Sequence, residues 1–280
     1  MEQTYKTIIR PKTGWRDINL KELWDYRDLT FLFVKRNFST RYKQTILGPA
    51  WLLLSPLIST LISTFVFGTI AEIPSDGVPY FIFYMCGNMA WTYFAYCLNN
   101  TASAFTGNAA VFGKVYFPRL VMPLSSTITG LMEFGINAVM FAAFWAYFKL
   151  SGAAIAMTWV MALMPLLILQ MAALGLGCGI IISSLTTKYR DLTVLVGFGV
   201  SLWMYVTPVI YSTNSLSPKL HALCMLNPMA PIIEMFRCAC LGTGEVSLGY
   251  WGISVIVTAV ILAAGVVLFS KVEKTFMDTV

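Results

Sequence analysis

The sequence predicts an all-α integral membrane protein with six transmembrane helices, an N-terminal interfacial helix and a re-entrant outer segment before the last helix. Of its 280 residues, 58% are hydrophobic and only 11% are charged, whereas a soluble domain carries roughly a quarter charged residues. Apolar runs recur from Leu47 to the C-terminus, several of them longer than the ~20 residues that a helix needs to cross hydrocarbon. The alternating ~10-residue strands typical of an outer-membrane barrel do not occur in the sequence.

Hydropathy divides the chain into three parts, which are a cytoplasmic and interfacial segment 1–46, a transmembrane domain 47–270 and a cytoplasmic tail 271–280. The predicted crossings are Leu47–Ala71, Tyr80–Asn100, Leu120–Phe148, Ile155–Ser183, Thr193–Tyr211 and Ser247–Phe269. The polar first segment has no short apolar core with a small-residue cleavage site, so no cleaved signal peptide is expected. The first crossing then serves as the insertion signal.

The distribution of lysine and arginine predicts the orientation. With six crossings, sixteen of these cations fall on the side of the two termini, and three fall on the opposite side, namely Lys149, Lys219 and Arg237. An excess of cations marks the cytoplasmic side, so both termini are predicted to be cytoplasmic. The net charge of +6 is explained by this membrane face, and it requires no nucleic-acid partner.

The N-terminal segment is predicted to contain an interfacial helix. Asn19 to Glu22 resembles a capping box that starts a helix, and Gly48-Pro49 breaks the helical pattern before the first crossing. One helical stripe consists of Phe31, Val34, Phe38 and Tyr42, with Arg36 and Lys43 roughly opposite. This pattern favours a helix at the membrane surface, with its cations near anionic headgroups. A soluble helix docked on a partner protein explains the pattern equally well.

The outer segment between Ser212 and Val246 is too long for a simple turn and too apolar for a free loop. Its prolines and apolar residues after Asn227 predict a short helix that enters the membrane without crossing it. Such backbone is tolerated only where protein or a water-filled cavity covers it. The segment is therefore a candidate rim of a pathway.

Few residues offer chemistry. Glu133 is the one clear charge within a predicted crossing, and an intramembrane charge is a functional hypothesis by default. A protonated acid bonded to a neighbouring helix is the equally weighted alternative. No catalytic constellation is recognisable. The stretch Gly107 to Val115 departs from a phosphate-binding loop in spacing and lacks its serine or threonine, so any ATP hydrolysis must belong to another chain.

A metal site is not expected. Three of the six cysteines lie in apolar runs, where a thiol usually acts as a small hydrophobe. The other three are predicted on the outer side with the single histidine, His221, which leaves too few ligands for a metal. The six cysteines are Cys86, Cys97, Cys178, Cys224, Cys238 and Cys240.

Aromatic residues gather near mid-membrane, although tryptophan and tyrosine normally mark the headgroup interfaces. They are Trp91, Tyr93, Phe94 and Tyr96 in the second crossing, and Trp203 and Tyr205 in the fifth. Aromatic surfaces suit the apolar C–H faces of sugar rings, so these residues are candidates for lining a substrate pathway. Simple packing between helices is the alternative for each of them. The Gly175 to Gly179 run has a GxxxG spacing, which permits close helix contact within or between subunits.

Two cytoplasmic segments are candidates for contact with a soluble partner, Ala102–Pro118 and Ser183–Asp191. A helix-in-groove contact needs a rigid exposed segment of this kind, whereas the alternative is an ordinary solvated turn. The predicted contact residues are Lys114, Tyr116, Arg119, Tyr189, Arg190 and Asp191.

Several stretches together resemble the ABC-2 permeases that export polysaccharides. They are Arg41-Tyr-Lys-Gln-Thr-Ile-Leu-Gly-Pro-Ala-Trp51, Pro74-Ser-Asp-Gly-Val-Pro-Tyr80, Gly107-Asn108, Lys114-Val-Tyr-Phe-Pro-Arg119, Tyr189-Arg-Asp191 and Asn227-Pro228. The similarity covers essentially the whole chain in the expected order. Among the subfamilies, the chain is most similar to the O-antigen exporter permeases, followed by the teichoic acid permeases and then the capsule exporters.

The resemblance implies a homodimer in the bacterial inner membrane, bound to two ABC ATPase subunits that carry ATP and Mg²⁺. The chain itself is then a transport subunit without a bound cofactor or enzymatic activity. The implied substrate is a polysaccharide linked to undecaprenyl diphosphate. We expect Arg36, Arg41 and Lys43 to attract the diphosphate, and we expect ATP binding to move the first and fifth crossings apart through the two cytoplasmic segments.

Three other functions fit the sequence less well. An ATP-independent flippase needs more ionisable groups within the membrane and often has inverted repeats. A membrane glycosyltransferase needs an acidic cluster. A scaffold without transport activity leaves the mid-membrane aromatics and the re-entrant segment without a role.

Overall fold

The computed structural model describes residues 20–275 except 44, 113–114, 116 and 187–191. The described part is all-helical. Its α-helices are α1 (Leu20–Asp25), α2 (Arg27–Tyr42), α3 (Trp51–Ser63), α4 (Tyr80–Ala102), α5 (Ala104–Phe112), α6 (Val121–Leu150), α7 (Met164–Thr186), α8 (Leu192–Val206), α9 (Pro218–Met225), α10 (Met229–Leu241) and α11 (Leu248–Thr275). Short 3-10 turns η1 (Gly48–Ala50), η3 (Trp159–Leu163) and η4 (Thr213–Ser215) and a π-helical turn, η2 (Thr64–Ile70), complete the set.

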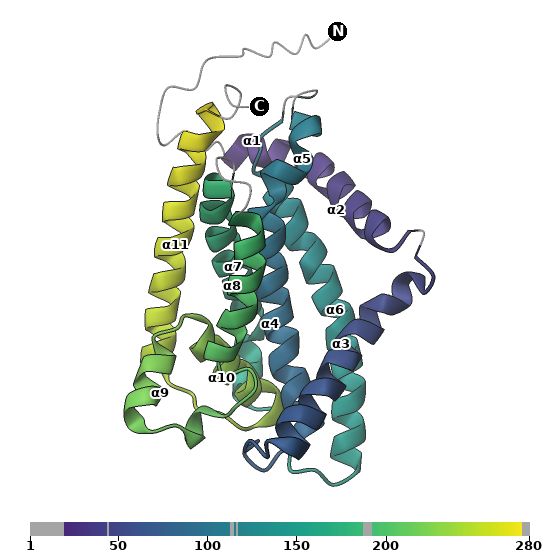
Figure 1. Ribbon diagram of the computed structural model, residues 1–280, viewed down its shortest axis with the longest axis vertical. Coiled ribbons are helices and arrows are strands. Elements are labelled where there is room, and N and C mark those ends of the chain that lie inside the picture. Colours follow the sequence, from purple (N-terminus) through teal and green to yellow (C-terminus); the bar gives the residue numbers. More distant parts are fainter. Residues whose placement is uncertain (1–19, 44, 113–114, 116, 187–191, 276–280) are drawn as a thin grey trace.

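The long helices form one bundle with two distinct ends (Figure 1). Helices α1, α2 and α5 lie at one end, where α11 also finishes, and α9 and α10 lie at the other. The α3–η2 run, α6 and α8 lead towards the end with α9 and α10, whereas α4, α7 and α11 lead away from it. We call the end with α2 and α5 the α5 end, and the opposite end the α10 end.

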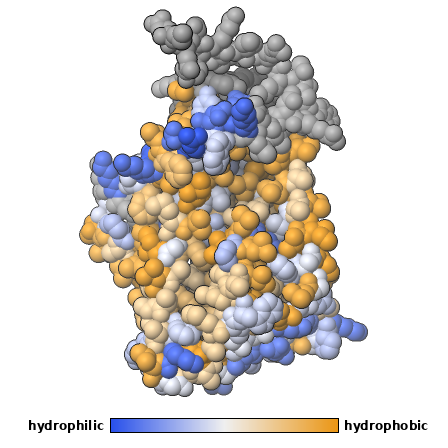
Figure 2. All heavy atoms as spheres, turned by 180° about the vertical axis from the view of Figure 1, so that it is seen from behind, coloured by the Kyte–Doolittle hydropathy of each residue, from blue (hydrophilic) through white to orange (hydrophobic). Residues whose placement is uncertain are grey.

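Among the described residues, four helical runs are long and apolar enough to cross a membrane, namely Gly48–Ile70, Val121–Leu150, Trp159–Thr186 and Leu248–Phe269. Each of these runs begins and ends within a few residues of the bounds of a predicted crossing. On the face shown in Figure 2, apolar side chains cover the middle of the molecule and hydrophilic residues lie mainly towards both ends. A girdle of this kind fits a bilayer around the bundle.

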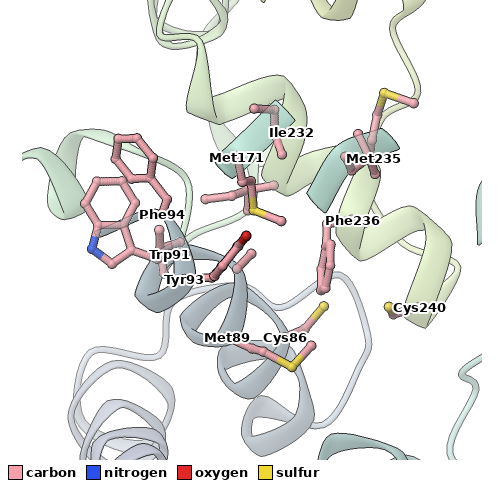
Figure 3. Packing of buried hydrophobic residues seen from close by; sticks show 14 of the residues in the cluster. Cys86, Met89, Trp91, Tyr93, Phe94, Met171, Ile232, Met235, Phe236 and Cys240 are labelled. Atoms are coloured by element: carbon pink, nitrogen blue, oxygen red, sulfur yellow. The ribbon is translucent and has the colours of Figure 1, made fainter. Parts of the chain in front are cut away.

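Helix α4 is the centre of the bundle. It packs on α6, α7, α3 and α10, and residues around its whole circumference are buried. In the main core, Met89 and Phe94 of α4 pack with Met171 of α7 and Phe236 of α10 (Figure 3). Because neighbouring helices cover it, α4 tolerates polar residues such as Asn88, whose side chain is buried.

The Gly175 to Gly179 run of α7 makes the close helix contacts that its spacing predicts, and it makes them within one chain. A Cβ atom at Gly175 would lie 2.7 Å from the Cβ of Cys97, and one at Gly179 would lie 2.5 Å from the Cβ of Thr101, so this face of α7 touches α4. Gly177 faces the other way, where a Cβ atom would lie 2.9 Å from the Cα of Leu262 in α11. Helix α7 is therefore held between α4 and α11.

A second, smaller core lies at the α5 end and connects α2 and α5 to the bundle. Phe33 of α2 and Phe112 of α5 both pack on Phe117, with ring centroids 5.6 and 5.4 Å apart. Phe269 of α11 and Met122 of α6 belong to the same cluster. These apolar contacts fix α2 across the end of the bundle.

The face of α2 that packs on the bundle differs from the predicted apolar stripe. Thr30, Phe33 and Val34 are buried, whereas Phe31 is 61% exposed. Of the predicted stripe, Phe31 is therefore exposed on α2, whereas Val34 packs on the bundle. Helix α1 begins at Leu20, directly after the predicted cap at Asn19, which itself lies outside the described residues.

Candidate functional site

A pocket of about 520 Å³ opens between the α3–η2 run and α8. Ser55, Ser59 and Ser63 line it from α3, where their spacing of four residues places them on one helical face. Tyr205 lines it from α8 and is 59% exposed. Hydroxyl groups and an exposed aromatic ring thus share a surface that belongs to two of the predicted crossings.

The predicted pathway aromatics of α4 mostly lie inside the chain. Trp91, Tyr93 and Phe94 are all buried in the main core (Figure 3). The rings of Trp91 and Phe94 contact Trp203 of α8, with centroids 6.1 and 5.2 Å away in edge-on geometry. Within a single chain these rings act as packing that joins α4 to α8.

Trp203 and Tyr205 occupy different surroundings on α8. Trp203 is partly buried, and its indole Nε1 donates to Asn227 Oδ1 at 3.2 Å. Asn227 Nδ2 in turn donates to Thr207 Oγ1 at 2.8 Å. This network connects α8 to the start of α10. Tyr205, by contrast, faces the pocket beside α3.

A second pocket, of about 440 Å³, lies at the α5 end, where α2 crosses α4, α5 and α6. Its lining is largely polar and includes two of the predicted headgroup residues, Arg36 and Arg41, together with Tyr96, which was predicted to line the pathway. The remaining lining residues are Asn37, Thr40, Asn100, Ser103, Ala104, Gly107, Asn108 and Ser126. We call this the α2 pocket. Lys43 is exposed just beyond the C-terminal end of α2 and does not line it.

Glu133, which sequence reasoning left between two roles, forms an ion pair at the edge of this region. Arg41 Nη1 lies 3.0 Å from Glu133 Oε1, and the guanidinium lies 5.0 Å from the centre of the Tyr96 ring. The Glu133 side chain is only 12% exposed, against 48% for Arg41. A carboxylate on α6 is thus paired with a cation of α2.

Of the predicted partner-contact residues, Arg119 is described. It is buried and lies 6.0 Å from the centre of the Phe112 ring at the end of α5. Helix α5 occupies most of the predicted segment Ala102–Pro118 and is kinked at Asn108. Lys114, Tyr116, Tyr189, Arg190 and Asp191 lie outside the described residues.

Sequence reasoning missed a buried charged pair at the α10 end, where it treated Arg237 as an outer-side cation. Arg237 and Glu234 lie one turn apart on α10, with both side chains 1% exposed and 3.2 Å between Nη1 and Oε1. Arg237 also donates to the carbonyl oxygens of Val209 at 2.6 Å and Tyr211 at 3.0 Å. Its guanidinium lies 3.9 Å from the centre of the Phe83 ring on α4. The only sequence signal was a Glu-x-x-Arg spacing within an apolar stretch.

This pair links three elements to α10. Arg237 holds the chain that leaves α8, and Glu234 Oε2 accepts from the backbone N–H of Glu245, just before α11, at 3.4 Å. Burial raises the pKa of the Glu234 carboxyl above its ordinary value even though the Arg237 guanidinium lies beside it. The close fit extends to α4, where a Cβ atom at Gly87 would lie 2.7 Å from the carbonyl oxygen of Val209.

Comparison with known proteins identifies one family model. The model described as "ABC-2 type transporter" matches residues 28–241, which include both pockets and the buried pair on α10.

Curated relatives match over most of their length. The chain is 27% identical to the O-antigen export system permease protein RfbA of Klebsiella pneumoniae over 251 residues, which is 90% of this chain and 94% of the relative. It is 27% identical to the protein of the same name from Myxococcus xanthus, over 78% of this chain and 82% of the relative. The capsule polysaccharide export inner-membrane protein CtrC of Neisseria meningitidis is 21% identical over 85% of this chain and 89% of the relative.

Proposed function

Because the chain belongs to the ABC-2 type transporter family, we propose that it is the permease subunit of an exporter that moves a lipid-linked polysaccharide of the O-antigen type across the bacterial inner membrane. The names of its curated relatives, which are export permeases for O-antigen and capsule polysaccharide, support this substrate class. The proposed lipid carrier is undecaprenyl diphosphate.

The observation that carries the proposal is the pocket between α3 and α8. Three serines of α3 and Tyr205 of α8 interrupt an otherwise apolar lining, where lipid contact alone would favour hydrocarbon side chains. Hydroxyl groups can hydrogen-bond sugar hydroxyls, and an exposed ring can pack on a sugar face. Tyr205, Trp203 and Tyr96 are the proposed pathway residues that retain exposed surface. Trp91, Tyr93 and Phe94 would support them from behind, or would reach the pathway only after the helices move.

We propose six crossings with both termini in the cytoplasm. The two crossings beyond the four long apolar helices are α4 and α8. Helix α4 has 23 residues, a length of about 34 Å that suits a hydrocarbon core of about 30 Å. Helix α8 is shorter, with 15 residues, and the chain up to Tyr211 extends it. Helix α10 then forms the re-entrant segment, since it is buried along its length but has only 13 residues.

The proposed assembly is a homodimer bound to two ABC ATPases, which supply the ATP and Mg²⁺ chemistry. Helix α5 and the segment 183–191 are the proposed contacts with the ATPases, through Lys114, Tyr116, Arg119, Tyr189, Arg190 and Asp191. The position of α5 at one end of the bundle, on the same small core as α2, supports this role. Arg36, Arg41 and Lys43 are proposed to attract the lipid headgroup at the same end.

Teichoic acid or capsule polysaccharide is the alternative cargo, and an ATP-independent flippase is the alternative mechanism. Glu133 is the only described acid within the proposed crossings, and it is paired with Arg41. An ion-coupled flippase needs more ionisable groups within the membrane than this, so we favour the ATP-driven exporter.

Reconstitution tests the proposal. The chain is co-purified with an ABC ATPase encoded beside it, placed in proteoliposomes, and supplied with a fluorescent lipid-diphosphate oligosaccharide. We expect translocation only with the ATPase, ATP and Mg²⁺ together. Translocation by the permease alone would favour the flippase, and a chain that recruits no ATPase and moves no glycan would refute the proposal. Alanine in place of Tyr189, Arg190 and Asp191 should preserve assembly but uncouple ATP hydrolysis from transport.

A further inference from the structure

Among the described residues, the α2 pocket is lined by two cationic side chains and by no acidic one. Two guanidinium groups line it, those of Arg36 and Arg41, and Glu133 is the acid paired with one of them. Arg36 contacts neutral groups instead, donating to the side-chain oxygens of Asn37 and Asn108 at 3.1 Å each. Within the described part of the chain, no carboxylate lies at ion-pair distance from Arg36.

The pocket also places hydroxyl and amide groups around these cations, although Thr40, Asn100 and Ser103 each donate to a backbone carbonyl oxygen of the preceding helical turn. Side chains of Thr40, Asn100, Ser103 and Ser126 line it with the two arginines. A volume of about 440 Å³ far exceeds the ~30 Å³ share of one water molecule. Guanidinium groups recognise phosphate oxygens with paired N–H donors, a geometry that a lysine point charge does not offer. The lining therefore suits a phosphate or diphosphate group.

In the ion pair with Arg41, the Glu133 carboxylate competes with any incoming anion for the Arg41 guanidinium. Glu133 is nearly buried on α6, whereas half of the Arg41 side chain is exposed at the end of α2. Arg41 can therefore turn towards an incoming anion more readily than the carboxylate can follow. A phosphate group brings a larger charge than a carboxylate, and it can contact Arg36 as well as Arg41.

We propose that the α2 pocket is a phosphate-binding site, and that Glu133 occupies Arg41 until the phosphate group of a lipid-linked ligand displaces it. This inference rests on the proposed export of a diphosphate-linked lipid and assigns its headgroup a place. The pocket also contains Gly107 and Asn108 of α5, and Asn108 bonds Arg36 directly. A bound phosphate that engages Arg36 therefore acts on the helix proposed to contact the ATPase.

Direct binding tests the site. The full-length permease is placed in nanodiscs of phosphatidylcholine, and native mass spectrometry or thermophoresis measures binding of farnesyl diphosphate, with farnesol as the uncharged control. We expect wild-type protein to bind farnesyl diphosphate and not farnesol. Arg36→Ala and Arg41→Ala should each weaken binding about tenfold or more, since each removes a charge-assisted contact.

Two variants separate recognition from folding and from bulk charge. Glu133→Gln should tighten binding by up to about fivefold, because it removes the competitor while leaving the pocket's donors in place. A variant that is merely destabilised has no reason to bind more tightly. Lys35→Ala is the matched control, since Lys35 is exposed on α2 next to Arg36 and does not line the pocket. It should bind as the wild type does.

Competition identifies the source of the phosphate. Inorganic diphosphate that displaces farnesyl diphosphate equally well would support an anion site without a lipid requirement, whereas equal competition by phosphatidylglycerol would support a site for bulk headgroups. Weak competition by both supports the lipid diphosphate. Unchanged binding by Arg36→Ala and Arg41→Ala, or weaker binding by Glu133→Gln, would overturn the proposal. If those variants bind normally while the wild-type complex exports glycan, the pocket assignment fails and the proposed function stands.

Discussion

Replacing Arg237 with methionine should destabilise the protein strongly, because this residue is the donor at the centre of the α10 end. Its side chain is 1% exposed and contacts Glu234 and the carbonyl oxygens of Val209 and Tyr211. Removing one partner of a buried ion pair costs about 3–5 kcal/mol, since the other charge is left without compensation. The carbonyl oxygens of Val209 and Tyr211 also lose their side-chain donor, which places Arg237→Met towards the upper end of that range.

A double-mutant cycle isolates the charged pair from these carbonyl bonds. Glu234→Gln alone should cost less than Arg237→Met, because Arg237 keeps its bonds to the carbonyl oxygens of Val209 and Tyr211. The double variant should be more stable than the sum of the single costs predicts, by about 1–3 kcal/mol. It should remain less stable than the wild type, because the carbonyl oxygens of Val209 and Tyr211 still lack their donor.

The free energies of unfolding can be measured by titration with SDS in mixed micelles, followed by far-UV circular dichroism. Lys219→Met is the matched control, since Lys219 is an exposed cation on α9 at the same end of the molecule. Its change should stay within about 0.5 kcal/mol. A cost below about 1 kcal/mol for Arg237→Met, or strictly additive effects in the cycle, would refute the conclusion that the ion pair of Glu234 and Arg237 stabilises the α10 end.

Four further substitutions test the packing and the pathway. Trp91→Ala should cost about 3–5 kcal/mol of stability because the ring is buried. Tyr205→Ala should change stability by less than about 0.5 kcal/mol but reduce glycan export in proteoliposomes. The opposite pattern would assign packing to Tyr205 and the pathway to Trp91. Gly87→Ala should destabilise by about 1–3 kcal/mol in the SDS titration, since its Cβ atom would lie 2.7 Å from the Val209 carbonyl oxygen, and an unchanged midpoint would show that this contact relaxes freely. Gly175→Leu should reach the upper part of the same range, because a Cβ atom there already lies 2.9 Å from a backbone carbonyl oxygen of α4, and a wild-type unfolding curve would contradict the close packing of α4 and α7.

Much of the fold could be predicted because an apolar run long enough to span a bilayer has few alternatives to a helix. The predicted run Tyr80–Asn100 corresponds to α4 at Tyr80–Ala102, and Leu120–Phe148 corresponds to α6 at Val121–Leu150. The glycine spacing in α7 predicted a close contact, and the structure adds that the contact lies within one chain. Hydropathy and residue spacing were thus sufficient to predict the positions of these helices and a close helix contact at α7.

Side-chain partners were harder to predict because helical periodicity does not say which neighbour a face will meet. The sequence places Arg41 and Glu133 92 positions apart, and only the crossing of α2 over α6 brings them to 3.0 Å. Arg237 was counted among the cations of the outer side, and the count could not reveal that its side chain is fully buried. The mid-membrane aromatics were ambiguous for the same reason, since composition cannot separate a ring that packs inside from one that faces a pathway.

The burial of α4 on all sides also affects how the chain is made. Helix α4 is absent from the described helices that are apolar enough to span a membrane by composition, and it carries Asn88, Asn99 and Asn100. Such a segment partitions poorly into lipid on its own when it leaves the ribosome. Its stable integration therefore depends on α6 and α7, which are translated later and cover it. Until these helices are made, the buried side chain of Asn88 lacks part of the cover that it has in the folded protein.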